Sequence, residues 1–241
     1  MSVIKMIANE NDLRLFTEFE GVTAGFTRKP DTSDVRRNQM IAKMEKIGGC
    51  VVKPILVHGK EVVSVTKEMI AGKSYLEIPN TDGVVTNLSN VVLTTTHADC
   101  IPLYAYDSVK KVIGVAHAGW KGTSNGIAKE LVTTMVETYD CKPENITAYI
   151  GPGICKDHFE VGKDYAEECF TSKYAWMKEY IIDSSSDRVH IDLKGINKYF
   201  FELAKVGEIK ICDDCTYCDE RYYSFRRAKD TERMLAYIAM Q

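Results

Sequence analysis

Two histidines and one cysteine stand at the ends of apolar, strand-like segments, where a sheet could direct them toward one point. His58 follows the apolar run 53–57, Cys100 lies in a turn between two such runs, and His117 ends a third. Imidazole nitrogen and thiolate sulfur are preferred zinc ligands, and three protein ligands leave a fourth position for water or substrate. Zinc also lowers the pKa of a bound water to roughly 7. The pattern therefore predicts a catalytic zinc site.

The neighbours of these residues add to the predicted site. Asp99 precedes Cys100, and we expect Cys100, His117 and Asp99 to be the catalytic residues. Asp99 and Asp82 are candidates to orient the ligand imidazoles. A simpler interpretation also stands, because free cysteine often behaves as a small buried hydrophobe and the ligand spacing fits no compact zinc motif.

Several short segments rich in Val, Ile, Thr and Tyr, each bounded by turn residues, predict the strands that position this site. They are 51–57, 91–96, 101–106, 112–116 and 146–150. The middle three follow one another closely, as in an antiparallel meander or a buried sheet.

Helical periodicity occurs between and around these strands. Ile127, Leu131 and Met135 recur every four residues after the cap candidates of 122–125. Two further helices are expected, one capped by Asp192, carrying Ile196, Phe200 and Leu203 and ended by Gly207, the other over 33–47 with Ser33 or Asp34 as cap. Strands outnumber regular strand–helix alternation, so we predict an α+β fold.

Composition limits the classes of function. The 241 residues are 45% hydrophobic and 27% charged, as in an ordinary globular protein, and no linker divides them, so we expect one domain over 1–241. A formal net charge of −3 without basic clusters predicts no nucleic-acid or membrane partner. The N-terminus lacks signal-peptide features, so we expect a cytoplasmic protein whose eight cysteines are reduced thiols or metal ligands.

Five ordered motifs resemble those of the YfiH family, also called the laccase-domain or multicopper polyphenol oxidoreductase family. Residues 56–59 resemble its QVH-like strand end, 98–102 its ADC-x-P turn, and 116–122 its AHAGW-[KR]-G turn. Residues 151–155 with 159–162, and 223–227 with Thr231 and Arg233, resemble its later blocks. The resemblance covers nearly the whole chain.

The resemblance implies a function. It assigns zinc to His58, Cys100 and His117, and a layered α/β/β/α arrangement with mixed sheets. It implies a purine nucleoside phosphorylase acting on adenosine, inosine, guanosine and methylthioadenosine, with adenosine deaminase side activity. The expected partners are a purine nucleoside and phosphate, and the expected state is a monomer or small homo-oligomer. Copper is less favoured, because a multicopper site needs more than the five histidines present.

The phosphate-binding part departs from the family pattern. The family's V-x-x-NR is Val35–Gln39 here, so Gln39 replaces the expected arginine. We expect Arg28, Arg37, Asn38 and Arg227 to bind the substrate. Arg226 and Arg227 could bind phosphate bidentately or form surface ion pairs near Asp230 and Glu232.

Other interpretations remain for the same residues. Cys100 could be a hydrolase nucleophile activated by His117 or His58. The zinc could instead be non-catalytic, with His97 closing its coordination. The C-x-x-C-x-x-C run of Cys212, Cys215 and Cys218 could hold a second metal, but without a fourth cysteine we expect ordinary thiols.

Overall fold

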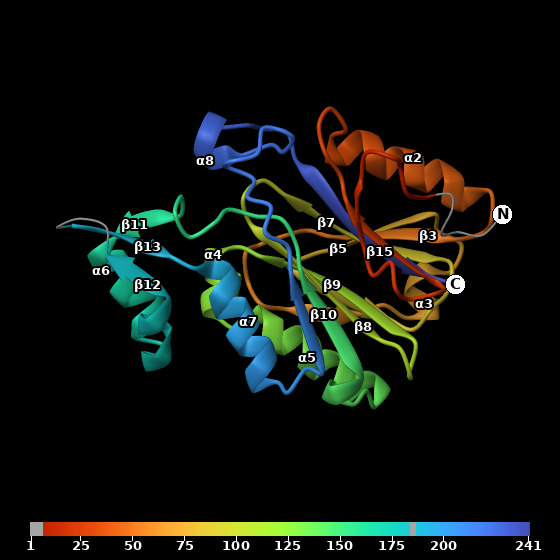
Figure 1. Ribbon diagram of the computed structural model, residues 1–241. Helices are drawn as coiled ribbons and strands as arrows, with labels where there is room; N and C mark the ends of the chain where they lie inside the picture. Colours follow the sequence, from red (N-terminus) through yellow and green to blue (C-terminus); the bar gives the residue numbers. More distant parts are fainter. Residues whose placement is uncertain (1–6, 184–186) are drawn as a thin grey trace.

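Two six-stranded sheets lie face to face, with helices on their outer faces (Figure 1). The computed structural model describes residues 7–183 and 187–241. The first sheet has the order β1 (Leu13–Leu15), β2 (Val22–Phe26), β15 (Met234–Met240), β7 (Val91–His97), β3 (Cys50–Pro54) and β5 (Tyr75–Ile78). The second has the order β14 (Glu208–Ile211), β10 (Ile146–Ile150), β8 (Ile101–Asp107), β9 (Val112–Ala118), β6 (Gly83–Thr86) and β4 (Val62–Ser64).

Both large sheets combine parallel and antiparallel pairs. In the first sheet β3 runs parallel to β5 and β7, whereas β15 runs antiparallel to β2 and β7. In the second sheet β8 and β9 form an antiparallel hairpin, and β14 and β4 add parallel strands at the edges. The predicted α+β class with layered mixed sheets is confirmed.

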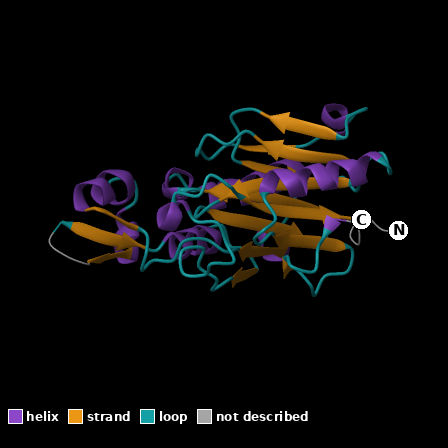
Figure 2. Cartoon of the chain, turned by 90° about the horizontal axis from the view of Figure 1, so that it is seen from above, coloured by secondary structure: helices purple, strands orange, loops and turns teal. Residues whose placement is uncertain are grey.

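A third, smaller sheet stands apart from the two large ones (Figure 2). It contains β11 (Glu160–Gly162), β13 (Arg188–Ile191) and β12 (Ile181–Asp183), all antiparallel. The short helices α6 (Lys163–Ala166) and η3 (Ala175–Tyr180) pack against it, and η2 (Glu167–Thr171) contacts both of these helices.

The remaining helices lie on the large sheets or in their connections. Helix α2 (Ser33–Glu45) covers the first sheet, and α5 (Ile127–Tyr139) and α7 (Leu193–Leu203) cover the second. Shorter helices are α3 (Lys67–Ile70), α4 (Trp120–Ser124), η1 (Pro143–Asn145) and α8 (Phe225–Ala228). No described helix is long and apolar enough to span a membrane.

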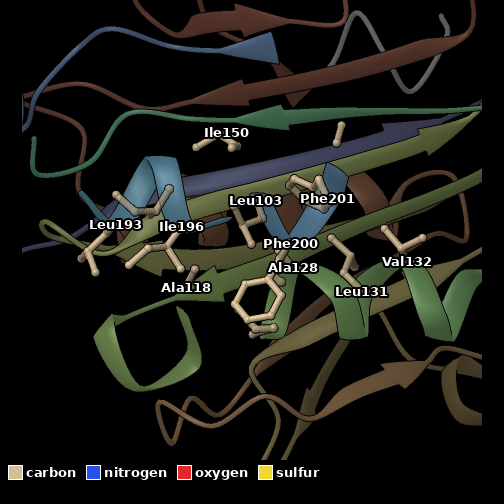
Figure 3. Close-up of a cluster of buried hydrophobic side chains, with 14 of the residues drawn as sticks. Leu103, Ala118, Ala128, Leu131, Val132, Ile150, Leu193, Ile196, Phe200 and Phe201 are labelled. Carbon is tan, nitrogen blue, oxygen red and sulfur yellow. The ribbon is translucent and has the colours of Figure 1, made fainter. Parts of the chain in front are cut away.

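Alternating side chains on the central strands fill three separate cores. On β8, Tyr104 and Tyr106 point between the two sheets, whereas Leu103 and Ala105 point to the helices. Figure 3 shows the helix-side core, where Leu103 and Ile150 meet Leu131, Ile196 and Phe200. Full burial of each such side chain contributes about 1.5–3 kcal/mol, so this core holds β8 and β9 against α5 and α7.

Of the two arrangements expected for the three middle strands, an antiparallel meander or a buried sheet, the meander is wrong. Strand β7 belongs to the first sheet and β8 to the second, so the chain crosses between sheets at 98–100. Every residue of β8 and β9 is buried, as are most of β7, because both faces of each sheet are covered. Hydrophobic alternation therefore cannot show which sheet a strand joins.

The helix caps follow prediction only in part. Asp192 caps α7 by accepting a hydrogen bond from the Gly195 N–H at 2.8 Å, as expected. Thr32, not Ser33 or Asp34, caps α2, and α5 begins after the left-handed Gly126. Helix α7 ends at Leu203, before Gly207.

Candidate metal centre

The structure brings the side chains of His58, Cys100 and His117 together. One potential ligand atom from each lies within 4.8 Å of the others. His58 follows β3, Cys100 lies in the crossing from β7 to β8, and His117 lies near the end of β9. We call these three residues the cavity cluster, and the sheet-to-sheet crossing is what brings Cys100 to it.

His58 is held by a buried carboxylate under its backbone. Asp82 accepts hydrogen bonds from the backbone N–H groups of His58 at 2.8 Å and Gly59 at 2.7 Å. His58 itself has a φ of 58°, a conformation uncommon for a non-glycine residue. Asp82 therefore fixes a strained turn, and its oxygens bond backbone N–H groups of the turn, not the imidazole that we expected it to orient.

His117 presents one unpaired nitrogen. Its Nδ1 lies 2.9 Å from the Thr96 carbonyl oxygen, which only accepts, so Nδ1 carries the proton. Its Nε2 is buried without a hydrogen-bond partner. Burial, and then the nearby His58, lower the pKa of His117 to about 3, so the ring is neutral. A neutral imidazole with a free, buried Nε2 is the form that ligates a metal.

Cys100 lies in a turn that other loops hold in place. Asp99 has a φ of 85°, and its carboxylate accepts hydrogen bonds from Thr216 Oγ1 at 2.7 Å and the Arg226 backbone N–H at 2.6 Å. Burial, and then the Asp99 charge, raise the pKa of the Cys100 thiol to about 12. The thiol therefore keeps its proton unless a cation replaces it.

His97 lies beside this cluster with both ring nitrogens engaged. Nε2 lies 2.8 Å from Thr95 Oγ1, and Nδ1 lies 3.1 Å from the Cys100 carbonyl oxygen. The His97 ring stacks on His117, with centroids 4.8 Å apart. His97 therefore helps to hold the Cys100 turn, through its hydrogen bond, and the His117 ring, through the stacking contact.

Gly119 gives the three side chains room to meet. A Cβ at this position would lie 2.8 Å from His58 Cδ2, 3.3 Å from Cys100 Sγ and 3.6 Å from His117 Nε2. Any larger residue would therefore occupy space beside all three donors, so packing explains why a glycine stands at position 119.

The cavity cluster forms one wall of a cavity of about 660 Å³. This volume lies in the range for small-molecule sites. Its rim carries the rings of Trp120, Phe159 and Phe225 and the cationic side chains of Arg226, Lys229 and Arg233. The aromatic rings suit a flat ligand and the cations suit an anion.

The residues expected to bind substrate lie elsewhere. Arg28 bonds Tyr222 Oη at 3.1 Å, Arg37 pairs with Asp34, and Asn38 is exposed on α2. The Arg227 guanidinium donates hydrogen bonds to four backbone carbonyls, including those of Thr216 and Tyr222. Among the described residues, none of these four lines the cavity.

Sequence reasoning missed three residues of the cavity rim as site residues: Phe159, Lys229 and Phe225. Phe159, Phe225, Arg226 and Arg233 all stand in motifs of the resemblance, but their positions at the cavity could not be read from spacing. The segment 225–233 is held at the cavity by a tertiary contact, the bond from the Arg226 N–H to Asp99.

The family described as multi-copper polyphenol oxidoreductase laccase matches residues 16–241 of this sequence. The chain belongs to this family. YfiH and YlmD proteins are among its relatives, so the resemblance to the YfiH family is confirmed.

Three relatives are named for one of two activities. A purine nucleoside phosphorylase of Deinococcus radiodurans is 39% identical over 66% of this chain and 61% of its own length. The purine nucleoside phosphorylase YfiH of Shigella flexneri is 32% identical over 87% of this chain and 81% of its own. Adenosine deaminase RL5, from an unknown prokaryotic organism, is 33% identical over 61% and 56%.

A solved structure shows the same fold. The hypothetical protein YfiH of Bacillus licheniformis superposes with a TM-score of 0.77, at 26% identity, over 91% of this chain and 93% of that protein. The chain therefore shares the fold of that YfiH protein.

Proposed function

We propose that this chain is a zinc-dependent purine nucleoside phosphorylase with adenosine deaminase side activity. Relatives named for both activities support the proposal, as does a cavity that combines the Cys/His cluster, aromatic rings and cationic side chains. Adenosine, inosine, guanosine and methylthioadenosine are the proposed nucleosides.

His58, Cys100 and His117 would hold the metal. Two imidazole nitrogens and one thiolate are a donor set that zinc prefers, and the buried, unpaired His117 Nε2 is the single observation that carries the assignment. Zinc in such a site supplies a Lewis acid that polarises an oxygen or lowers the pKa of a bound water.

The cationic side of the cavity would bind phosphate. Arg226 is anchored by bonds from its Nη1 to the carbonyls of His158 and Glu160, and Arg233 bonds the carbonyls of Asp230 and Glu232. Lys229 lies over the Phe225 ring at 4.6 Å. These three cations, in place of Arg28, Arg37, Asn38 and Arg227, are our proposed phosphate contacts.

The aromatic side would bind the purine and so orient the reaction. Trp120 and Phe159 present rings on which a base can stack. In phosphorolysis a phosphate oxygen forms the new bond to ribose C1′ while the C1′–N9 bond breaks and its electron pair leaves with the purine. We propose that Asp99 positions Cys100 and Arg226 for this reaction, since its carboxylate bonds Thr216 and the Arg226 N–H.

Product analysis with adenosine, with and without phosphate, tests the proposal. Adenine and ribose 1-phosphate formed only with phosphate are the expected products, with a smaller amount of inosine. One zinc per cavity cluster, lost with activity in Cys100→Ala, is expected from metal analysis. Copper in place of zinc, or an active Cys100→Ala variant, would overturn the zinc-dependent assignment.

A cysteine hydrolase using Cys100 predicts the opposite response to chelation. Its activity would survive removal of metal and be abolished by iodoacetamide. Burial holds the Cys100 thiol pKa at about 12, which leaves almost no thiolate nucleophile at neutral pH in the absence of a cation. The same chelation experiment therefore separates the two functions.

A further inference from the structure

A second Cys/His cluster lies in the loops beyond the cavity. Cys155, His158, Cys215 and Cys218 each place one potential ligand atom within 4.8 Å of the others. We call these four residues the loop cluster. We propose that the loop cluster is a closed, structural zinc site that joins the segment after β10 to the segment after β14.

The spacing of the donors is close to that of tetrahedral coordination. The His158 Nδ1 lies 3.1 Å from Cys155 Sγ and 3.4 Å from Cys218 Sγ. Zinc bonds of about 2.3 Å to sulfur and 2.0–2.1 Å to nitrogen place tetrahedral ligand atoms about 3.5–3.8 Å apart. Both contacts are a few tenths of an ångström shorter than this spacing, so the donors need to move apart only slightly to hold one ion.

The backbone forms two short turns that present the donors in pairs. Cys155 and His158 are separated by two residues, as are Cys215 and Cys218, the spacing of structural zinc loops. The His158 N–H bonds the Cys155 carbonyl at 3.1 Å, and the Asp219 N–H bonds the Cys215 carbonyl at 2.9 Å. Each pair therefore belongs to one hydrogen-bonded turn.

Contacts around the cluster fix the donors as outer-shell partners do. The Cys155 N–H donates to Cys215 Sγ at 3.2 Å, a bond that stabilises negative charge on the sulfur. The His158 ring stacks on Tyr217, with centroids 4.0 Å apart. A parallel bridge between Gly153 and Cys215 links the two turns.

The donor set also explains a departure from the sequence-based expectation. Cys212 is outside the cluster, so the C-x-x-C-x-x-C run contributes two of its three cysteines. Cys155 and His158, 60 residues away from Cys215 and Cys218, complete the set. Four protein donors leave no position for substrate, which is typical of a structural zinc site.

A zinc ion here would stiffen one wall of the cavity. Thr216, between two of the cluster cysteines, donates to Asp99 beside Cys100. Phe159 and Ile154, which flank Cys155 and His158, line the cavity. The loop cluster would thus stabilise the segment that carries Ile154 and Phe159, although none of its own four residues is among the cavity's described lining residues.

Zinc counting on matched variants of the full chain tests the proposal. We expect two zinc ions per wild-type chain, one in Cys155→Ser/Cys218→Ser, one in Cys100→Ala, and none in the combined variant. Cys212→Ser is the matched control and should keep both ions. The Cys100→Ala background separates the two sites, so failure of the catalytic proposal leaves this test readable.

Cobalt(II) gives a second readout that does not depend on activity. Reconstituted Cys100→Ala protein should show sulfur-to-cobalt absorption from three thiolates. Loss of the half-buried His158 side chain in His158→Ala should weaken metal retention against a chelator by at least 10-fold. A Cys155→Ser/Cys218→Ser variant with undiminished zinc, or a wild-type chain with one zinc that Cys100→Ala abolishes, would overturn the proposal.

Discussion

The cavity cluster and the loop cluster use the same donor chemistry in different settings. The cavity cluster has three donors, from strand ends of both large sheets, and lines a cavity of about 660 Å³. The loop cluster has four donors, from two loop turns, and lies outside the described lining of that cavity. The number of donors and their access to a cavity, more than the donor types, separate a reactive metal site from a structural one.

Loss of a donor should reduce activity at the cavity cluster and thermal stability at the loop cluster. We expect Cys100→Ala to lower phosphorolysis by more than about 100-fold, beyond the range for outer-shell partners, because it removes the metal from the cavity. Cys218→Ser should lower the melting temperature while leaving the turnover number close to that of the wild type. Steady-state kinetics and thermal melts on both variants check this contrast, and equal loss of activity in both would contradict it.

Removal of a cavity cation should affect phosphate more than nucleoside. Arg233→Gln loses a charge-assisted contact of about 1.5–3 kcal/mol, which corresponds to roughly a 10- to 150-fold rise in KM for phosphate. Arg188→Gln, at an exposed ion pair on the small sheet, is the control. An unchanged KM for phosphate in Arg233→Gln would remove this residue from the proposed binding site.

Crowding the cavity cluster should weaken its metal without changing a donor. In Gly119→Ala the new Cβ would lie 2.8 Å from His58 Cδ2, so we expect about a 10- to 100-fold loss of metal affinity, as for outer-shell changes. Gly162→Ala, where a Cβ meets nothing within 4 Å, should bind metal normally. Competition with a chelator measures both, and equal affinities would show that Gly119 serves another purpose.

Loss of the carboxylate that holds the His58 turn should have a smaller effect. Asp82→Asn keeps the shape of the side chain but removes its negative charge and one of the two oxygens that accept hydrogen bonds from the N–H groups of 57–59. We expect a fall in metal affinity of about 10-fold, the lower end for outer-shell partners. Titration with zinc checks this value, and an effect as large as that of Cys100→Ala would point to direct coordination.

The smallest effect on metal content is expected at His97. Both of its nitrogens are engaged by Thr95 and Cys100, so His97→Ala should retain zinc while lowering stability. Burial is the main reason that the pKa of His97 is well below its usual value, and His117 lowers it further. Metal analysis of the folded variant checks this, and loss of zinc would place His97 among the ligands.

Sequence reasoning predicted the residues of the cavity cluster because chemistry-bearing side chains are conspicuous at strand ends. It also predicted most of the central strands, since strand-forming residues between turns show where a strand begins and ends. It left open whether Arg226 binds phosphate and did not place Lys229 or Arg233 at the cavity, because the path of the segment 225–233 depends on Asp99 and on α8.

The sequence alone determined the donors of the cavity cluster and most of the central strands that carry them. Only the tertiary structure decided that β7 and β8 lie in different sheets, that Asp82 holds the His58 turn, and that Cys155 and His158 meet Cys215 and Cys218. The physical reason is that strands buried on both faces carry no pattern that identifies their neighbours. Donors from distant loops are likewise brought together only by the packing of the sheets between them.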